Sequence, residues 1–339
     1  THRGKRGNNR GGAKRRRGRD PNRDASIITM FFANITSYSD HAKFYISGRT
    51  EDVVLLAETH QNATETADMV RELTAMGWST TASPAMLTER SETGTMAGVA
   101  VAIAPYIDNR PSSFCTDEKG QSTKNAFITT RTLTLEMVEV QVLAGYLQCG
   151  GLNGENLRTL TQVDLITRGG RDLFLWGLDA NVPPTEWDKL TVGKRTWLDV
   201  MNAEIIVVSN STFTCRGKQG TEGGSNTDYF IMSRQLVPLV KSLVAIFDVP
   251  WSPHFGLSLT LNAKPTEVWQ RILVKPSLPR EAIEMSKPKA PIKKAVIECK
   301  IARAKARAEE AAKIITEHNA KANVWEQNCN TTAIEETTL

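Results

Sequence analysis

Short apolar runs that end in polar residues recur along most of the chain. The run LFLWGLDANVPP, residues 173–184, shows this pattern clearly. Its first four residues predict a buried strand, Gly177 and the two prolines predict the exit from that strand, and Asp179 and Asn181 stand at its end. Taken alone, this ending has two interpretations. Both polar side chains bond nearby backbone groups in an Asx-type turn, or they belong to a functional site at a sheet edge.

Similar runs on both sides of this stretch predict alternating strands and helices. The apolar spacing predicts strands at residues 26–34, 53–58, 78–82, 98–104, 127–135, 138–146, 204–208, 228–232, 239–248 and 257–261, and helices at residues 39–46, 65–76 and 156–167. The four strands between residues 78 and 146 predict an antiparallel meander. Together these elements predict one α/β (α+β) domain over residues 25–263.

Both ends of the chain differ in composition from this domain. Residues 1–24 hold almost no apolar side chain, which predicts a disordered basic arm. Repeated prolines after residue 264 predict a linker over residues 264–292. The Ala, Lys, Glu and Arg that follow predict an appended helix over residues 293–325, with a tail over residues 326–339.

The net charge of +5 is unevenly distributed, because the basic residues gather at both ends and acidic residues outnumber them between. Closely spaced cations in a flexible arm are suited to bind the phosphate backbone of nucleic acid, most simply DNA. A solubility or targeting tail is the alternative. The cations of the arm that predict the nucleic-acid contact are Arg3, Lys5, Arg6, Arg10, Lys14, Arg15, Arg16, Arg17 and Arg19.

Membrane insertion and secretion are not predicted, since the sequence has no apolar run long enough to span a bilayer and no apolar signal segment at its start. We therefore expect an intracellular protein, nuclear or cytoplasmic. The five cysteines are widely spaced and form no CxxC pair. This spacing predicts a reducing compartment and argues against a zinc site.

Polar residues at or near the ends of the predicted strands form an ordered set. They are Asn34, Glu58, Tyr146, Asp179, Asn181, Asp228 and His254. With the segments FANITS, VVLLAETH, AGVAVAI, LAGYL, LWGLDANVPP, STFT with NTDYFIMS, and SPHFGL, the set resembles the endonuclease/exonuclease/phosphatase superfamily. These DNase I-like enzymes are metal-dependent phosphoesterases. The ETH form and the basic ends look most like the endonuclease domains of retrotransposons.

The resemblance implies a fold and a metal-dependent activity. The fold is a four-layered sandwich of two mixed β-sheets flanked by helices. The activity is nicking of DNA by an activated water, with Mg²⁺ or Mn²⁺ as the cofactor. Glu58 would be the metal ligand, with Asn34 beside it directly or through water. Asp179 would orient or deprotonate the attacking water, and Asn181 would hold a phosphate oxygen.

The same resemblance implies roles for the remaining residues of the set. Tyr146 would donate a hydrogen bond to the phosphate. His254 would contact the scissile group, and Asp228 would fix the tautomer and charge of His254. His60 would be a surface residue or lie behind these groups.

The sequence departs from the family at several positions. Pro253 stands where the family has an Asp, and proline offers neither a ligand nor a donor. Ala57, Leu178 and Ala180 replace a Gln, a Gly and an aromatic residue. The change at Pro253 leaves alternatives to the active nuclease open. These are a catalytically weakened or inactive nucleic-acid-binding protein, and a phosphatase of the same superfamily that acts on an inositol phosphate or a lipid headgroup.

Overall fold

The computed structural model describes residues 24–88, 94–112, 125–136, 138–209, 212–216 and 223–268. All of them lie in the first of two structural units, which spans residues 1–270. The predicted basic arm, the proline-rich linker after residue 268, the appended helix and the tail lie outside the described residues. They stay predictions.

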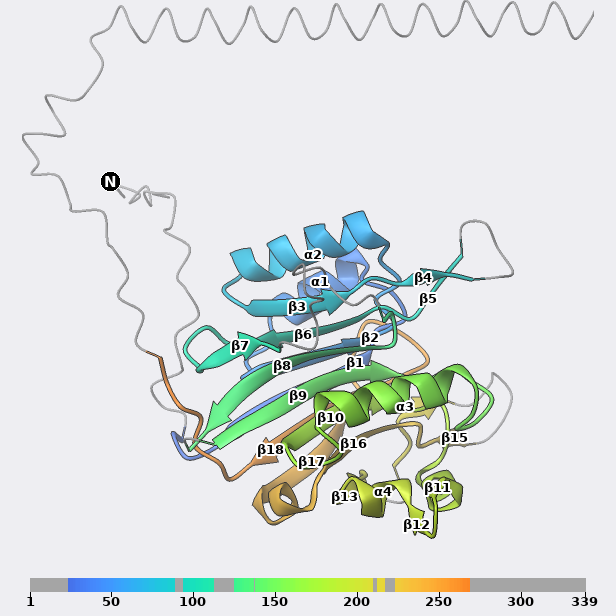
Figure 1. Cartoon of the computed structure of the whole chain (residues 1–339). Helices are drawn as coiled ribbons and strands as arrows, with labels where there is room; N and C mark the ends of the chain where they lie inside the picture. The colour runs from blue at the N-terminus through green and yellow to red at the C-terminus, as the bar shows by residue number, and fades with distance from the viewer. Residues whose placement is uncertain are drawn as a thin grey trace, which may run out of the picture. The chain divides into compact units, whose positions relative to one another are not determined.

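Two six-stranded sheets stacked face to face form the centre of the first unit (Figure 1). The first sheet consists, in spatial order, of β17 (Val240–Ile246), β18 (Gly256–Leu261), β1 (Ile28–Asn34), β2 (Val53–Ala57), β6 (Val99–Ile103) and β3 (Ser79–Ser83). The second consists of β13 (Ala203–Ile206), β16 (Asp228–Ser233), β10 (Leu173–Asp179), β9 (Val138–Tyr146), β8 (Ile128–Leu135) and β7 (Asn109–Pro111). Both sheets are mixed, since β1 runs parallel to β2 and β10 parallel to β9.

The prediction of a single antiparallel meander over residues 78–146 is wrong. Strand β3 pairs with β6 in the first sheet, whereas β8 pairs with β9 in the second. Both antiparallel pairs place one face on the same central core, so their apolar patterns look alike. The pattern predicts that the strands exist, but it does not reveal that the chain crosses from one sheet to the other between β6 and β8.

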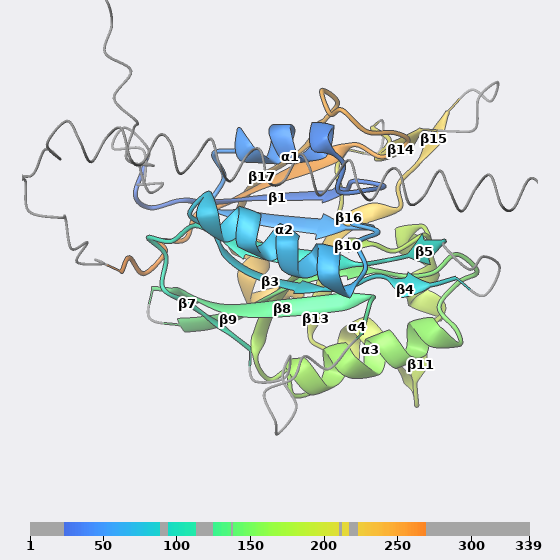
Figure 2. The same cartoon turned by 90° about the horizontal axis from the view of Figure 1, so that it is seen from above.

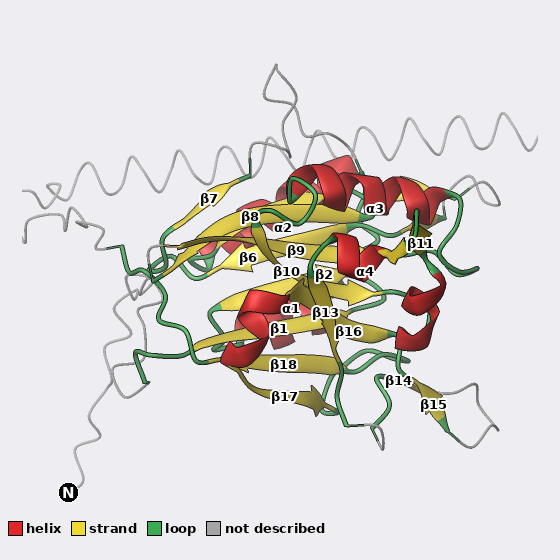
Figure 3. Ribbon diagram, turned by 60° about the horizontal axis from the view of Figure 1, so that its bottom comes forward, coloured by secondary structure: helices red, strands yellow, loops and turns green. Residues whose placement is uncertain are grey.

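Helices cover the outer faces of both sheets. Helices α1 (Asp40–Ser47) and α2 (Ala63–Ala75) lie over the first sheet, as Figure 2 shows. Helices α3 (Glu155–Ile166) and α4 (Trp197–Val200) lie on the other side of the sandwich (Figure 3). Two 3₁₀ helices, η2 (Pro184–Lys189) and η3 (Arg234–Leu239), and three short strand pairs complete this part of the chain. The pairs are β4 (Met86–Leu87) with β5 (Thr95–Met96), β11 (Thr191–Val192) with β12 (Arg195–Thr196), and β14 (Cys215–Arg216) with β15 (Gly224–Ser225).

Local sequence explains where the first two helices begin. The Ser39 hydroxyl accepts a hydrogen bond from the backbone of Ala42 at the start of α1. At the start of α2, Asn62 and Glu65 form a reciprocal capping box. Both starts agree with the predicted helices to within two residues. Among the described residues, no helix is long and apolar enough to cross a membrane.

The alternation of side chains along β10 determines which residues face the centre. Trp176 and Leu178 pack outward against the cluster that includes α3. Leu175 and Gly177 face inward, and a Cβ at Gly177 would lie 2.8 Å from atoms of two side chains in the first sheet. The predicted exit at Gly177 is therefore wrong, because this glycine lies inside β10 and lets the two sheets approach each other. By the same alternation, Asp179 faces the space between the sheets.

Substituting Gly145 by Ala is expected to lower the free energy of unfolding by about 1–3 kcal/mol, because there is no room for a side chain at this position. A Cβ on Gly145 would lie 2.1 Å from Nε1 of the fully buried Trp176. Chemical denaturation measures the effect. Gly48→Ala is the matched control, because Gly48 has a φ of −82° and its Cβ would meet only ordinary contacts. Equal stability of the two variants would contradict this packing.

Candidate active site

Polar side chains from both sheets converge at one end of the sandwich. In the second sheet, Asp179 on β10 is paired with Tyr146 on one neighbouring strand and with Asp228 on the other. In the first sheet, Asn34 is the last residue of β1, and Glu58 follows the last residue of the parallel strand β2. The strand topology thus brings together five of the seven residues that the sequence singles out.

Asn34 joins the two carboxylates across the gap between the sheets. Its Nδ2 donates hydrogen bonds to Oε2 of Glu58 at 2.6 Å and to Oδ2 of Asp179 at 2.7 Å. Its Oδ1 accepts a hydrogen bond from the backbone of Thr36 at 2.9 Å. The amide nitrogen, not the oxygen, therefore faces the carboxylates. In this arrangement Asn34 positions the two acids, and its place beside a cation, directly or through water, stays a prediction.

Glu58 and His60 form a second contact at the same end of β2. Both have left-handed backbone conformations, with φ of 52° and 54°. His60 Nε2 lies 3.7 Å from Oε1 of Glu58, and Nδ1 of His60 donates to the carbonyl of Thr95 at 2.7 Å. Burial alone would raise the pKa of Glu58, but His60 and Asn34 hold it below its usual value. Glu58 is therefore ionised at neutral pH, and His60 lies directly behind it.

Asp179 has no exposed surface. One carboxylate oxygen accepts the hydrogen bond from Asn34, and the other accepts one from the backbone N–H of Asn181 at 3.2 Å. Burial and the nearby charge of Asp228 raise the pKa of Asp179 well above its usual range. A buried carboxylate with a raised pKa is a stronger proton acceptor than an ordinary aspartate.

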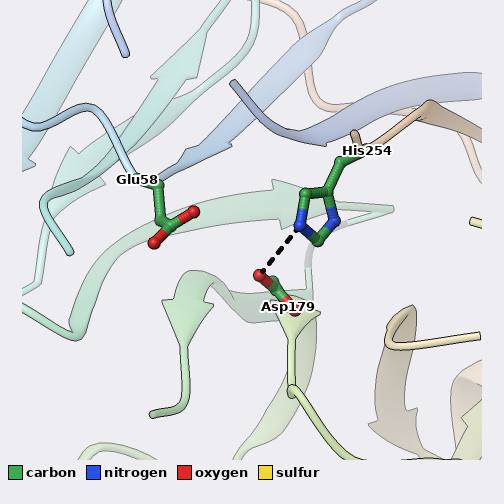
Figure 4. Close-up of side chains that lie close together, drawn as sticks. All are labelled: Glu58, Asp179 and His254. Atoms are coloured by element: carbon green, nitrogen blue, oxygen red, sulfur yellow. Dashed lines mark ion pairs between the residues drawn. The ribbon is translucent and has the colours of Figure 1, made fainter. Parts of the chain in front are cut away.

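His254 is held by Asp228 and turned toward Asp179. The carboxylate of Asp228 accepts a hydrogen bond from Nδ1 of His254, at 2.9 Å to Oδ2 and 3.1 Å to Oδ1. This leaves Nε2 3.9 Å from Oδ2 of Asp179 and 3.8 Å from Sγ of Cys215. In Figure 4 the side chains of Glu58, Asp179 and His254 point toward a common space.

The surroundings of His254 favour its charged form. Burial alone would lower the pKa of His254, but the hydrogen bonds with Asp228 and Cys215 and the charge of Asp179 raise it to about 11. At neutral pH the ring is therefore an imidazolium whose Nε2–H is directed into the site. A positioned cation of this kind can donate a hydrogen bond to a phosphate oxygen.

Pro253 does not disturb the backbone that presents His254. The carbonyl of Pro253 accepts a hydrogen bond from the backbone N–H of Arg216 at 3.0 Å. On the other side of the histidine, the N–H of Phe255 donates to the carbonyl of Thr214 at 2.8 Å. His254 is thus fixed against β14 from both sides, although Pro253 itself offers no carboxylate.

Tyr146 and Asn181 line the remaining sides of the site. The ring of Tyr146 stacks on Phe127, with centroids 6.2 Å apart and an interplanar angle of 14°. Burial, followed by the charges of Glu58 and Asp179, raises the pKa of Tyr146, so its phenol stays protonated. Asn181 donates its amide to the carbonyl of residue 147 at 2.8 Å. The roles of both side chains toward phosphate stay predictions.

Three residues near the site are not found by sequence reasoning. Thr214 is fully buried, and its hydroxyl accepts hydrogen bonds from the backbone of Thr227 at 3.1 Å and of Asp228 at 3.0 Å. The STFT segment contains this threonine, but the sequence does not predict its hydrogen bonds to the backbone of Thr227 and Asp228. Cys149 and Cys215 contact Asn181 and His254 at 3.3 and 3.8 Å. Nothing in the spacing of the cysteines indicates these contacts.

The donor set of this end of the sandwich is suited to a divalent cation. One polar atom each of Glu58, Asp179 and His254 lies within 4.8 Å of the others, and the two carboxylates are the groups that can act as ligands while His254 is charged. Two of the three are hard carboxylate oxygens, which Mg²⁺ and Mn²⁺ prefer. The two acids are held close together by Asn34, and a cation bound at Glu58 would relieve their repulsion. The residues present therefore fit the cofactor that the sequence predicts.

Divalent cations are expected to stabilise the folded chain. At a Mg²⁺ or Mn²⁺ concentration about 100 times the Kd, the gain is about 2.7 kcal/mol, equivalent to a rise in Tm of roughly 5–10 °C. Thermal unfolding with and without chelator measures it. Glu58→Gln is expected to lose more than half of the shift, because it removes a ligand charge. Glu204→Gln, on an exposed position of β13, is the control. An equal shift in both variants would place the cation elsewhere.

His254 is expected to make the stability of the metal-free protein depend on pH. Its pKa is about 11 in the folded chain, against 6.5 for the ordinary side chain. The stabilisation is therefore complete below pH 6.5 and is lost as the pH rises toward 11. Denaturation in chelator at several pH values should show the free energy of unfolding falling over this window, and falling less steeply in His254→Gln. Identical slopes would contradict the raised pKa.

Two stacked mixed sheets, helices on the outer faces and a cluster of carboxylates, amide and histidine at one end define the class of this fold. It is the fold of the endonuclease/exonuclease/phosphatase superfamily, as the sequence resemblance implies. The predicted four-layered sandwich is confirmed.

Particular solved structures share this fold. The AP endonuclease LMAP from Leishmania major is similar with a TM-score of 0.52 and 14% identity, over 73% of this chain and 91% of that one. For the catalytic domain of APE2 from Xenopus laevis the TM-score is 0.50 and the identity 16%, over 72% of this chain and 94% of that one. The endonuclease domain of TRAS1, a telomere-specific non-LTR retrotransposon, gives 0.48 and 15%, over 69% and 98%. No protein-family model and no curated protein matches the sequence.

Proposed function

We propose that this protein is a divalent-metal-dependent phosphodiesterase, an endonuclease that nicks DNA. The observation that carries the proposal is the convergence of Glu58 and Asp179, joined by Asn34, with the Asp228–His254 pair on the opposite side of the same space. Phosphodiester hydrolysis needs a proton acceptor for water, donors for the phosphate oxygens and a positive charge. This end of the sandwich supplies a candidate for each.

Asp179 is the candidate for the residue that acts on water. Its raised pKa suits it to take a proton from an attacking water while Asn34 fixes its orientation. The new bond joins the water oxygen to phosphorus, and the bond from phosphorus to the sugar oxygen breaks, so that this oxygen leaves with the bonding electrons and takes up a proton from solvent. Glu58, ionised and held by Asn34 and His60, would bind the Mg²⁺ or Mn²⁺ that neutralises charge on the phosphate.

His254 and Tyr146 are the candidates for donors to the phosphate. The Nε2–H of His254 is directed into the site because Asp228 accepts the other ring N–H. The Tyr146 phenol remains protonated and lies beside Asp179 in the second sheet. Asn181, whose backbone N–H bonds Asp179, would fix one more oxygen with its amide.

A panel of phosphoesters tests the proposal against its alternatives. Purified protein with residues 1–339 is incubated with supercoiled DNA, single-stranded DNA, RNA and an inositol phosphate, each with Mg²⁺, with Mn²⁺ and with chelator. We expect metal-dependent cleavage of DNA. Release of phosphate from the inositol phosphate without nicking of DNA would favour a phosphatase. DNA binding that falls steeply with salt, with no cleavage under any metal, would favour the non-catalytic alternative. The lack of cleavage would then be attributed to Pro253.

A further inference from the structure

One buried hydroxyl links the two strands that carry Asp179 and Asp228. Tyr229 follows Asp228 on β16 and is fully buried. Its register partner on β10 is Leu178, the residue before Asp179. Tyr229 and Leu178 both pack in the cluster that includes α3, so the alternation of side chains turns the two acids to the other face of the sheet. The Tyr229 hydroxyl donates a hydrogen bond to the carbonyl of Val182 at 3.1 Å and thereby joins β16 to the chain that leaves β10.

A second hydrogen bond orients this hydroxyl. The Nε1–H of Trp187 donates to the oxygen of Tyr229 at 2.6 Å, and Trp187 is itself fully buried. The ring of Trp187 packs against Trp176, with centroids 6.4 Å apart, and against Trp197, with centroids 5.3 Å apart. An indole N–H can only donate, so the hydroxyl hydrogen of Tyr229 is left for the carbonyl of Val182. The three tryptophans therefore fix the direction in which Tyr229 donates.

The turn held in this way supplies a hydrogen bond to Asp179. Asn181 has a left-handed backbone conformation with a φ of 52°, which is unfavourable for a residue with a Cβ. In that conformation its backbone N–H donates to Oδ1 of Asp179 at 3.2 Å. On one side of Asn181, the N–H of Ala180 donates to the carbonyl of Thr227 at 2.8 Å. On the other side, the tyrosine hydroxyl holds the carbonyl of Val182. The chain at the start of β16 therefore fixes both sides of the turn.

We infer that Tyr229 is a positioning residue, whose hydroxyl holds the turn after β10 so that the N–H of Asn181 keeps the carboxylate of Asp179 in place for the attacking water. The hydroxyl lies in the cluster that includes α3, on the other face of the sheet from Asp179. It therefore acts through the backbone and does not touch the phosphate. The effect on the reaction rests on the proposed function, whereas the hold on the turn does not.

Two measurements on Tyr229→Phe, in the protein with residues 1–339, test the inference. Steady-state nicking should show kcat lowered by about 10- to 100-fold and KM changed by less than about 2-fold, because a displaced catalytic group slows the reaction more than it weakens binding. Amide hydrogen exchange in chelator should be at least about 5-fold faster in the peptide that covers residues 179–183, because the buried carbonyl of Val182 loses its donor. Tyr229→4-aminophenylalanine, which regains a donor, should restore both values.

Thr167→Val is the matched control, because it also removes a fully buried hydroxyl that both donates and accepts. This hydroxyl donates to the carbonyl of Val163 at 2.8 Å and accepts from the N–H of Gly170 at 3.3 Å, at the end of α3 and before β10 begins. Thr167→Val should unfold more easily but keep the wild-type kcat and the wild-type exchange of residues 179–183.

The outcomes separate this inference from the proposed function. Unchanged kcat or unchanged exchange in Tyr229→Phe, or an equal loss of kcat in Thr167→Val, would overturn the positioning role. A wild type that does not nick under any metal would refute the proposed nuclease. Faster exchange in Tyr229→Phe would then still establish the hold on the turn, and unchanged exchange would refute that hold as well.

Discussion

Replacing Asp179 by Ala is expected to reduce DNA nicking by at least about 1,000-fold, since a positioned general base alone contributes about 10²–10⁴-fold. Asp179 is fully buried, is paired with Tyr146 and Asp228 in the second sheet, and is joined to Glu58 through Asn34. No other carboxylate of the described site occupies an equivalent position. Initial rates of supercoiled-plasmid nicking measure the loss.

The fold should survive this substitution. Burial and the charge of Asp228 disfavour the ionised form of Asp179, so removing the carboxylate relieves a repulsion as well as breaking hydrogen bonds. Asp188→Ala, at an exposed position of η2, is the matched control and should nick like the wild type. A folded Asp179→Ala protein with nicking within about 10-fold of wild type would remove Asp179 from the proposed chemistry.

The second large effect is expected for His254→Ala, which should lower the nicking rate by about 10²–10³-fold, the usual cost of one lost donor to the reacting group. The imidazolium is buried against Asp228, and its free Nε2–H is directed toward Asp179. Because the charge of His254 is positioned before substrate binds, removing it should lower kcat more than it changes KM. Steady-state nicking over a range of plasmid concentrations separates kcat from KM.

His41→Ala serves as the control for this substitution, because His41 is an exposed histidine of α1. Asp228→Asn should lower the rate as well, since it weakens the hold on Nδ1 and the positive charge of His254. If His254→Ala and His41→Ala nick at equal rates, the contact of His254 with the scissile phosphate is wrong.

Strand ends and alternation made much of this site predictable from the sequence. Asp179 follows a buried run, and a period of two places it on the same face as Leu175, which packs in the central core. The same reasoning applies to Asn34 at the end of β1 and to Tyr146 at the end of β9. Such residues meet because the carboxyl ends of parallel strands lie at the same edge of a sheet. The apolar pattern predicts where each of these strands ends.

Contacts between segments far apart in the sequence could not be predicted in this way. Cys215 and His254 form a backbone β-bridge, and neither their residue types nor their spacing in the sequence predicts it. The rotation of the Asn34 amide depends on the Thr36 backbone and on two carboxylates from different sheets. The division of the meander between two sheets likewise depends on which partner each strand finds. These features arise from packing in three dimensions.

Pro253 removes a carboxylate next to His254 but does not change the position of His254. From the sequence, its effect on activity is open, because a carboxylate is missing. In the structure its carbonyl accepts a hydrogen bond from Arg216, and His254 still reaches Asp228. The missing carboxylate therefore bears on metal affinity and charge, not on the position of the histidine. A requirement for a higher Mg²⁺ concentration is the expected consequence.

The most direct measurement of the central claim is nicking of supercoiled plasmid by the wild type and Asp179→Ala side by side, over a Mg²⁺ series and in chelator. We expect nicked circles to accumulate with the wild type as Mg²⁺ rises, to be absent in chelator, and to be lost at every Mg²⁺ concentration with Asp179→Ala. Wild-type protein that binds the plasmid but leaves it supercoiled with Mg²⁺ and Mn²⁺ would contradict the claim. So would nicking that continues in chelator.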